Sequence, residues 1–444
     1  MEGRKRLVAE KPPVAAGAAG TLAPRFRLTR VFMLTGLAFL GPAWFSLVQA
    51  ADAVAQGRWL DPFLLSAVHL FVIGYALTVV QGAMLQIIPV AFQGRLYSIR
   101  LGYLQYVLMV LGALAFPVGF LAKRWDMVAA GGMLVLVAYG LLCWNLGQTA
   151  RTLKKRTEAL GIMTAFLFLL ATVIMGIGMA LGRPPAGQVT LPLHMVAGIT
   201  GWFTTLIVWL SPRLMSFFVS SRYPRLRRGG SGCLLFAGML AVIVSLALRG
   251  GGAMTPVAMG MWVGGWLLYL CGYLQVLIGI YRHFRERRRQ EVEWVLKWIL
   301  GGLYGGIGVL VLWAVVSSRF EKGWTLASGG FENSRTMSVM LLLIFGYLQW
   351  MIAAYMTKIM PFLRWMGRYG HGNPAGKTPE RRPGLAEMMP KRPTVAALLG
   401  FAAGAVMLAL GTCFGRGALT LTGAVLGAVA WVLYVAAMAV MYRR

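Results

Sequence analysis

The stretch HLFVIGYALTVVQGAMLQIIPV (residues 69–90) recurs in outline twice more along the chain, as HMVAGITGWFTTLIVWLSPRLMSFF (194–218) and MLLLIFGYLQWMIAAYMTKIMPFLRW (340–365). With Pro89, Ser216 and Pro361 aligned, each copy has a glycine and an aromatic residue at the same place. These pairs, 15 and 14 residues upstream, are Gly74-Tyr75, Gly201-Trp202 and Gly346-Tyr347. Three polar residues, Gln86, Arg213 and Lys358, also coincide. The chain therefore contains a threefold internal repeat.

The repeat lies in a chain with the composition of a membrane protein. Hydrophobic residues make up 58% of it and charged residues only 13%. Backbone groups in lipid must bond within their own segment, so long apolar runs predict spanning helices. There are twelve such runs: about 31–51, 63–92, 101–121, 127–147, 159–181, 189–218, 231–248, 254–280, 298–317, 337–363, 393–413 and 418–441. We expect an all-α membrane protein with a basic cytoplasmic tail (1–30), one twelve-helix domain (31–444) and a flexible cytoplasmic loop at 366–392.

The net charge of +30 is explained by topology. With the N-terminus inside, 34 of the 43 Lys and Arg residues fall at the inner face and 9 at the outer face. This asymmetry predicts a cytoplasmic (inner) membrane protein with both termini in the cytoplasm. We expect these basic residues to interact with the headgroups of the lipid bilayer. We expect no nucleic acid as a partner, since the sequence has no DNA- or RNA-binding motif.

The three copies of the repeat fall on the second, sixth and tenth helices. Spacing by four helices predicts three four-helix arcs around a pseudo-threefold axis. Tyr75, Trp202 and Tyr347 are then candidates for lining a cleft or for packing against a neighbouring helix. Arg213 and Lys358 fall near the inner ends of their helices, where long side chains reach lipid headgroups or another anion.

Two copies of the repeat begin with a histidine, and these residues are the best lead to function. His69 and His194 lie roughly 8–10 Å into the outer ends of their helices, at about 1.5 Å per residue. The third copy offers Met340 in the same place. Neutral imidazole is a common ligand of haem iron and copper, and methionine is a soft donor for both. The alternative is a structural histidine that bonds across helices, with methionine as ordinary core filler.

Other chemistry is disfavoured by what the apolar segments lack. All 13 acidic residues fall in predicted tails or connections, so no carboxylate stands at mid-membrane depth as a cation ligand or proton relay. The chain has no GxSxG, HExxH or P-loop motif. Its four cysteines are scattered and have the spacing of neither a zinc nor an iron–sulfur site.

The twelve helices, the arcs and the histidines near the outer ends of the second and sixth helices resemble subunit I of the haem-copper oxidase superfamily. Residues 69–89 and 194–218 are similar to segments of a divergent bacterial branch, and KIMPFLRW (358–365) ends the third copy. The resemblance implies that His69 occupies the position of a low-spin haem ligand and His194 that of a copper ligand.

The departures from the superfamily pattern are large. The seventh helix reads SGCLLFAGMLAVIVSLAL (231–248) and the tenth MSVMLLLIFGYLQW (337–350), and neither has the expected histidine pair. With four of six ligands missing, a complete oxygen-reducing centre cannot be assembled.

Two functions are open from the sequence. The first is a degenerate oxidase-like protein that holds one haem b or one copper ion near the outer face through His69, His194 or both, with Met340 as a further donor. It would serve electron transfer or a response to nitric oxide or oxygen, with respiratory-chain subunits or a small redox protein as partner. The second has no cofactor and is a membrane transporter or a scaffold for assembly of a respiratory complex.

Overall fold

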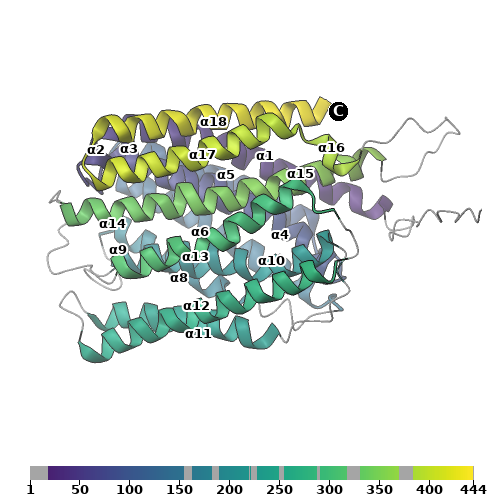
Figure 1. Cartoon of the computed structure of the whole chain (residues 1–444), viewed down its shortest axis with the longest axis horizontal. Helices are drawn as coiled ribbons and strands as arrows, with labels where there is room; N and C mark the ends of the chain where they lie inside the picture. The colour runs from purple at the N-terminus through teal and green to yellow at the C-terminus, as the bar shows by residue number, and fades with distance from the viewer. Residues whose placement is uncertain are drawn as a thin grey trace, which may run out of the picture.

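The computed structural model describes residues 19–154, 163–182, 190–219, 221, 228–249, 255–287, 291–317, 331–369 and 384–443. Within these ranges the chain is helical and forms a bundle of membrane helices (Figure 1). In chain order the helices are α1 (Ala19–Gln49), α3–η2–α4 (Pro62–Ala91), α5 (Ile99–Leu121), α6 (Trp125–Ala150), α8 (Phe166–Ala180), α9–η4–α10 (Thr190–Phe218), α11 (Arg228–Arg249), α12 (Pro256–Arg285), α13 (Trp294–Ser317), α14–η5–α15 (Phe331–Tyr369), α17 (Lys391–Cys413) and α18 (Gly417–Arg443). Eleven described helices are long and apolar enough to cross a membrane, and α8, with 15 described residues, is shorter.

The twelve helices fall into three groups of four, as the repeat predicts. In each group one helix packs on a repeat helix and the next two form a hairpin. The flanking helices are α1, α8 and α13, and the hairpins are α5/α6, α11/α12 and α17/α18. We call residues 62–91, 190–218 and 331–369 the three central helices. The second and third central helices are the most buried. In the most apolar segment of each, 89% and 83% of the residues, respectively, are buried inside the protein.

Each central helix contains a stretch of π-helix at the same place in the repeat. These stretches are η2 (Leu70–Leu77), η4 (Val196–Thr204) and η5 (Leu342–Leu348), and each contains the glycine–aromatic pair. A π turn inserts an extra residue and rotates the faces of the helix on either side of it. No sequence pattern predicted this feature, which begins one or two residues after the histidine or methionine of each copy.

Glycine is required at two of these stretches by a phenylalanine on the preceding helix. A Cβ atom at Gly74 would lie 2.8 Å from Phe39 Cγ, and one at Gly201 would lie 2.8 Å from Phe168 Cγ. Both distances are shorter than van der Waals contact. The close approach lets α1 and α8 pack against the second and sixth helices in the same manner.

Two predicted boundaries differ from the observed ones. Helix α1 begins at Ala19, inside the predicted 1–30 tail, although its apolar membrane span begins at Phe26. Backbone hydrogen bonding continues past the apolar residues, so a helix outlasts its hydrophobic stretch. Most of the predicted flexible loop at 366–392 lies outside the described residues, because residues 370–383 are not among them.

Candidate functional site

His69 is held at the end of α3 (Pro62–His69) by contacts with its own helix and with α5. Asp61 caps this helix, and its Oδ1 accepts hydrogen bonds from the backbone N–H groups of residues 63 and 64, which fixes where the helix begins. The Nδ1–H of His69 donates to the Leu65 carbonyl oxygen at 2.8 Å. The ring stacks on Phe116 with 5.1 Å between centroids and 11° between planes, and Phe120 lies 4.9 Å away.

His194 lies in α9 (Thr190–Met195) and is oriented by α8. Its Nδ1–H donates to the Thr172 carbonyl oxygen at 2.9 Å. The Thr172 hydroxyl donates one turn back, to the Phe168 carbonyl oxygen at 2.7 Å. Gly176 makes room for the ring: a Cβ atom there would lie 3.1 Å from His194 Cε1.

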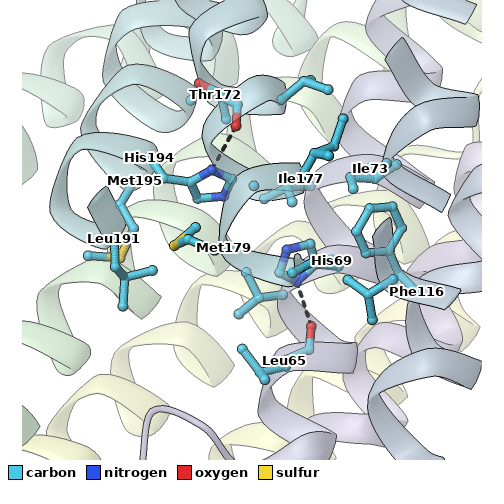
Figure 2. A pocket seen from close by; sticks show the side chains of 18 of the residues that line it. Leu65, His69, Ile73, Phe116, Thr172, Ile177, Met179, Leu191, His194 and Met195 are labelled. Atoms are coloured by element: carbon cyan, nitrogen blue, oxygen red, sulfur yellow. Dashed lines mark hydrogen bonds between the residues drawn. The ribbon is translucent and has the colours of Figure 1, made fainter. Parts of the chain in front are cut away.

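Both histidines line one cavity of about 960 Å³, and Figure 2 shows the two rings on its wall. A proton on Nδ1 leaves the lone pair of a neutral imidazole on Nε2. Among the described residues no hydrogen bond to Nε2 of either ring is found. The cavity therefore brings together two imidazoles of the same tautomer, each with no hydrogen bond to its Nε2 from a described residue.

The rest of the cavity wall is almost entirely apolar. Three methionines contribute to it: Met340, which the repeat singled out, and Met179 and Met195. Figure 2 shows Met179 between the two histidines. None of the described lining residues carries a charge. The exposed lining residues Leu60, Trp125 and Leu181 mark its mouth, at the end of the bundle that the charge distribution predicts to be outer.

None of the described residues that line this cavity is acidic or a cysteine. In the described part of the chain no group of three or more His, Cys, Asp and Glu residues is close enough to hold a metal ion. The sulfur atoms of the described lining are methionine thioethers.

The three repeat aromatic residues are not among those that line this cavity, and their cleft-lining role stays a prediction. Trp202 packs edge-on against Phe166 at 4.8 Å, Tyr75 packs on Phe71 at 5.4 Å, and the Tyr347 hydroxyl lies 3.3 Å from that of Tyr273. Their rings are 5% exposed or less and fill space between a central helix and its neighbours. A large ring directly after a glycine fits that space, because the glycine lets the adjacent helix approach.

Arg213 and Lys358 are engaged within the protein. The guanidinium of Arg213 donates to the Ala91 carbonyl oxygen at the end of α4 and lies 5.6 Å over the Phe92 ring. Lys358 forms an ion pair with Glu293 and lies 5.5 Å over the Phe218 ring at the end of α10. Each cation thus reaches the end of the preceding central helix, so these two contacts repeat the pseudo-threefold arrangement. The contact with lipid headgroups or an anion stays a prediction.

Comparison with known proteins identifies the architecture. The chain matches no protein-family model and no curated protein sequence. It does superpose on the structure of a haem-copper terminal oxidase, solved as a dimer, with a TM-score of 0.52 over 94% of this chain and 84% of that one. The chain has the fold of a haem-copper terminal oxidase. The sequence identity is 11%, so the likeness concerns the fold alone.

The sequence left open whether the two histidines share a site. The resemblance implied a haem-ligand position for His69 and a copper-ligand position for His194, and in the structure both residues line a single cavity. The His69 ring stacks on Phe116 of α5, and the His194 ring donates to the Thr172 carbonyl oxygen on α8. Any test of ligand binding should therefore treat the two histidines as parts of one candidate site.

Gly176 offers a direct test of this geometry. A Gly176→Val variant is expected to displace the His194 ring from the Thr172 carbonyl, because valine places methyl groups where Cε1 now lies. We expect an environment-sensitive His194 signal, measured by NMR of protein labelled at histidine, to move while that of His69 stays. A Gly140→Val variant is the matched control, since a Cβ at this helical glycine meets nothing within 4 Å. An unmoved His194 signal would contradict the geometry.

Proposed function

We propose that the protein binds one redox-active group, a haem b or a copper ion, in the cavity through His69, His194 or both. The observation that carries the proposal is the pair of Nδ1–H bonds to backbone carbonyls. Metal-ligating histidines almost always donate the second ring nitrogen in this way, which fixes the tautomer and raises the basicity of the coordinating one. A purely structural histidine has no need of an unbonded Nε2 that faces a cavity.

Haem b fits the size and polarity of the cavity. Its volume of about 960 Å³ is near the upper end of the usual range for small-molecule sites, roughly 300–1,000 Å³. The uncharged lining suits a porphyrin ring but offers no cation for its carboxylates. Those carboxylates would belong at the mouth, where the exposed Arg58 lies two residues before the lining residue Leu60. Arg124, beside Trp125, is already paired with Asp126.

Copper fits the donor set. Imidazole nitrogen and thioether sulfur are ligands that copper accepts, in particular as Cu(I). The two imidazoles and the sulfur atoms of Met179, Met195 and Met340 all belong to the cavity wall. A bare ion would leave most of the cavity unfilled, so the volume favours haem over copper.

Either group, when bound, supplies a one-electron couple, and haem iron also binds small gases. The residues of this chain would hold the imidazoles in one tautomer, exclude water by the apolar wall and keep the group close to the mouth. This placement supports electron transfer to respiratory-chain subunits or to a small redox protein, or a response to nitric oxide or oxygen. The proposal includes a cytoplasmic-membrane location with both termini inside, so that the mouth faces outward.

An optical spectrum of the detergent-purified protein, oxidised and dithionite-reduced, tests the proposal together with iron and copper analysis of the same sample. Stoichiometric iron with a reduced band of a b-type haem establishes the haem form, and stoichiometric copper without haem establishes the copper form. A flat spectrum with neither metal, after expression with ample haem and copper, would refute both. The function would then be that of a transporter or an assembly scaffold.

A further inference from the structure

An aromatic contact path joins His69 to the surface of the protein. The centre of the His69 ring lies 4.9 Å from that of Phe120, and the centre of the Phe120 ring lies 5.9 Å from that of Trp125. Both separations fall in the range of rings in direct contact, about 4.5–7 Å. Trp125 is 48% exposed. The path therefore has an imidazole at its buried end and, at its other end, an indole that a partner can touch.

The tight connection between α5 and α6 fixes this path. Phe120 lies in the last turn of α5, and Trp125 is the first residue of α6. Between them, the backbone N–H of Lys123 donates to the Phe120 carbonyl oxygen at 3.1 Å, and that of Arg124 donates to the Gly119 carbonyl oxygen at 2.8 Å. The contact between the two rings is therefore supported by backbone hydrogen bonds on both sides of the turn.

Trp125 combines two properties that the other tryptophans near it do not share. It lines the cavity and is also exposed. Trp59 lines the cavity but is only 6% exposed, whereas Trp144 of the same helix is 59% exposed but does not line the cavity. A tryptophan at a helix end is also typical of a membrane interface. Anchoring at the interface explains the exposed edge of Trp125, but it does not explain the contact with Phe120.

We propose that Trp125 is the residue through which the group held in the cavity exchanges an electron with a partner at the outer face, and that Phe120 couples it to His69. The inference rests on the proposed function, since it requires a bound redox group. The reduced group is oxidised by one electron and the partner is reduced by one electron, and no bond or proton changes. Electron tunnelling weakens steeply with distance and is faster through packed atoms than across open space. The contacting rings provide such a medium between the site and the surface.

The path can be tested without a redox group in the cavity. A luminescent rhenium(I) tricarbonyl phenanthroline complex coordinates neutral imidazole, and its excited state takes an electron from a nearby tryptophan. The complex is attached to His69 of the full-length protein after the other three histidines are replaced by glutamine. We expect its luminescence lifetime to lengthen several-fold in a Trp125→Phe variant, because phenylalanine is far harder to oxidise. Trp144→Phe is the matched control and should leave the lifetime unchanged.

The same measurement identifies the route. A Phe120→Leu variant should also lengthen the lifetime, because leucine leaves no ring between His69 and Trp125. Equal lifetimes with and without Trp125 would overturn the proposal. A longer lifetime in Trp59→Phe, but not in Trp125→Phe, would assign the exchange to Trp59 and overturn it as well. If the complex does not bind the folded protein, His69 is not an available ligand, and the proposed function is contradicted together with this inference.

Stopped-flow oxidation of the reduced, metal-loaded protein by ferricyanide gives a second measurement. Each ferricyanide ion takes one electron and becomes ferrocyanide. We expect Trp125→Phe to slow this oxidation several-fold, while the midpoint potential and the reduced spectrum stay as in the unaltered protein. A purified protein with neither iron nor copper would refute the proposed function. A loaded protein that is oxidised at an unchanged rate would refute only the role of Trp125.

Discussion

A Lys358→Met variant is expected to lose about 3–5 kcal/mol of its free energy of unfolding, because it removes the ammonium that forms a largely buried ion pair with the Glu293 carboxylate. Only 10% of the Lys358 side chain and 18% of the Glu293 side chain are exposed. The variant also loses the contact of the ammonium with the Phe218 ring. Reversible unfolding of the detergent-solubilised protein measures the effect.

Three further variants identify the cause of that loss. Glu293→Gln should be strongly destabilising as well, because it leaves the Lys358 charge unpaired. The double variant Glu293→Leu/Lys358→Met should recover much of the loss, because two apolar groups replace a buried pair at little cost. Lys297→Met is the matched control: this lysine is exposed one turn after Glu293, and its replacement should change stability by no more than about 0.5 kcal/mol. Equal losses for Lys358→Met and Lys297→Met would contradict the importance of the pair.

The sequence predicted most of the fold because lipid restricts what a spanning segment can be. Twelve apolar runs gave twelve helices, and the alignment on Pro89, Ser216 and Pro361 gave the three groups of four. The π turns were not predictable, since no residue type marks them. Glu293 lies in a connection directly before α13, as the sequence predicted, but its ion pair with Lys358 was not predicted. Such a pairing, 65 residues apart, leaves no local pattern.

The candidate site was predicted only in part. His69, His194 and Met340 were found from the repeat, and all three line the cavity. The groups that orient the imidazoles could not be found: the Leu65 and Thr172 acceptors are backbone carbonyls, which every residue has. Phe116 and Met179 come from helices outside the repeat, among many phenylalanines and methionines. Gly176 is one of 56 glycines, and only the packing of the His194 ring distinguishes it.

A His69→Ala variant is expected to abolish haem binding while the protein still inserts and folds. The imidazole is tied to Leu65 in its own helix, so its loss breaks no bond between helices. His194→Ala removes the bond to Thr172 on α8 and should therefore cost stability in addition to any effect on binding. Iron per protein and the reduced optical spectrum measure binding, and the elution volume in size-exclusion chromatography reports folding.

His283→Ala is the matched control. It removes a buried histidine of α12 that contacts the Ser221 hydroxyl and does not line the cavity. It should leave the spectrum unchanged. A His69→Gly variant extends the test, because free imidazole added to the buffer can occupy the space of the missing side chain and is expected to restore the spectrum. Loss of the folded protein in His69→Ala, without recovery by imidazole in His69→Gly, would mean that His69 is structural. If His69→Ala retains full haem and His194→Ala loses it, then His194 is the ligand. The cavity would remain the haem site, but the assignment of His69 as a ligand would be wrong.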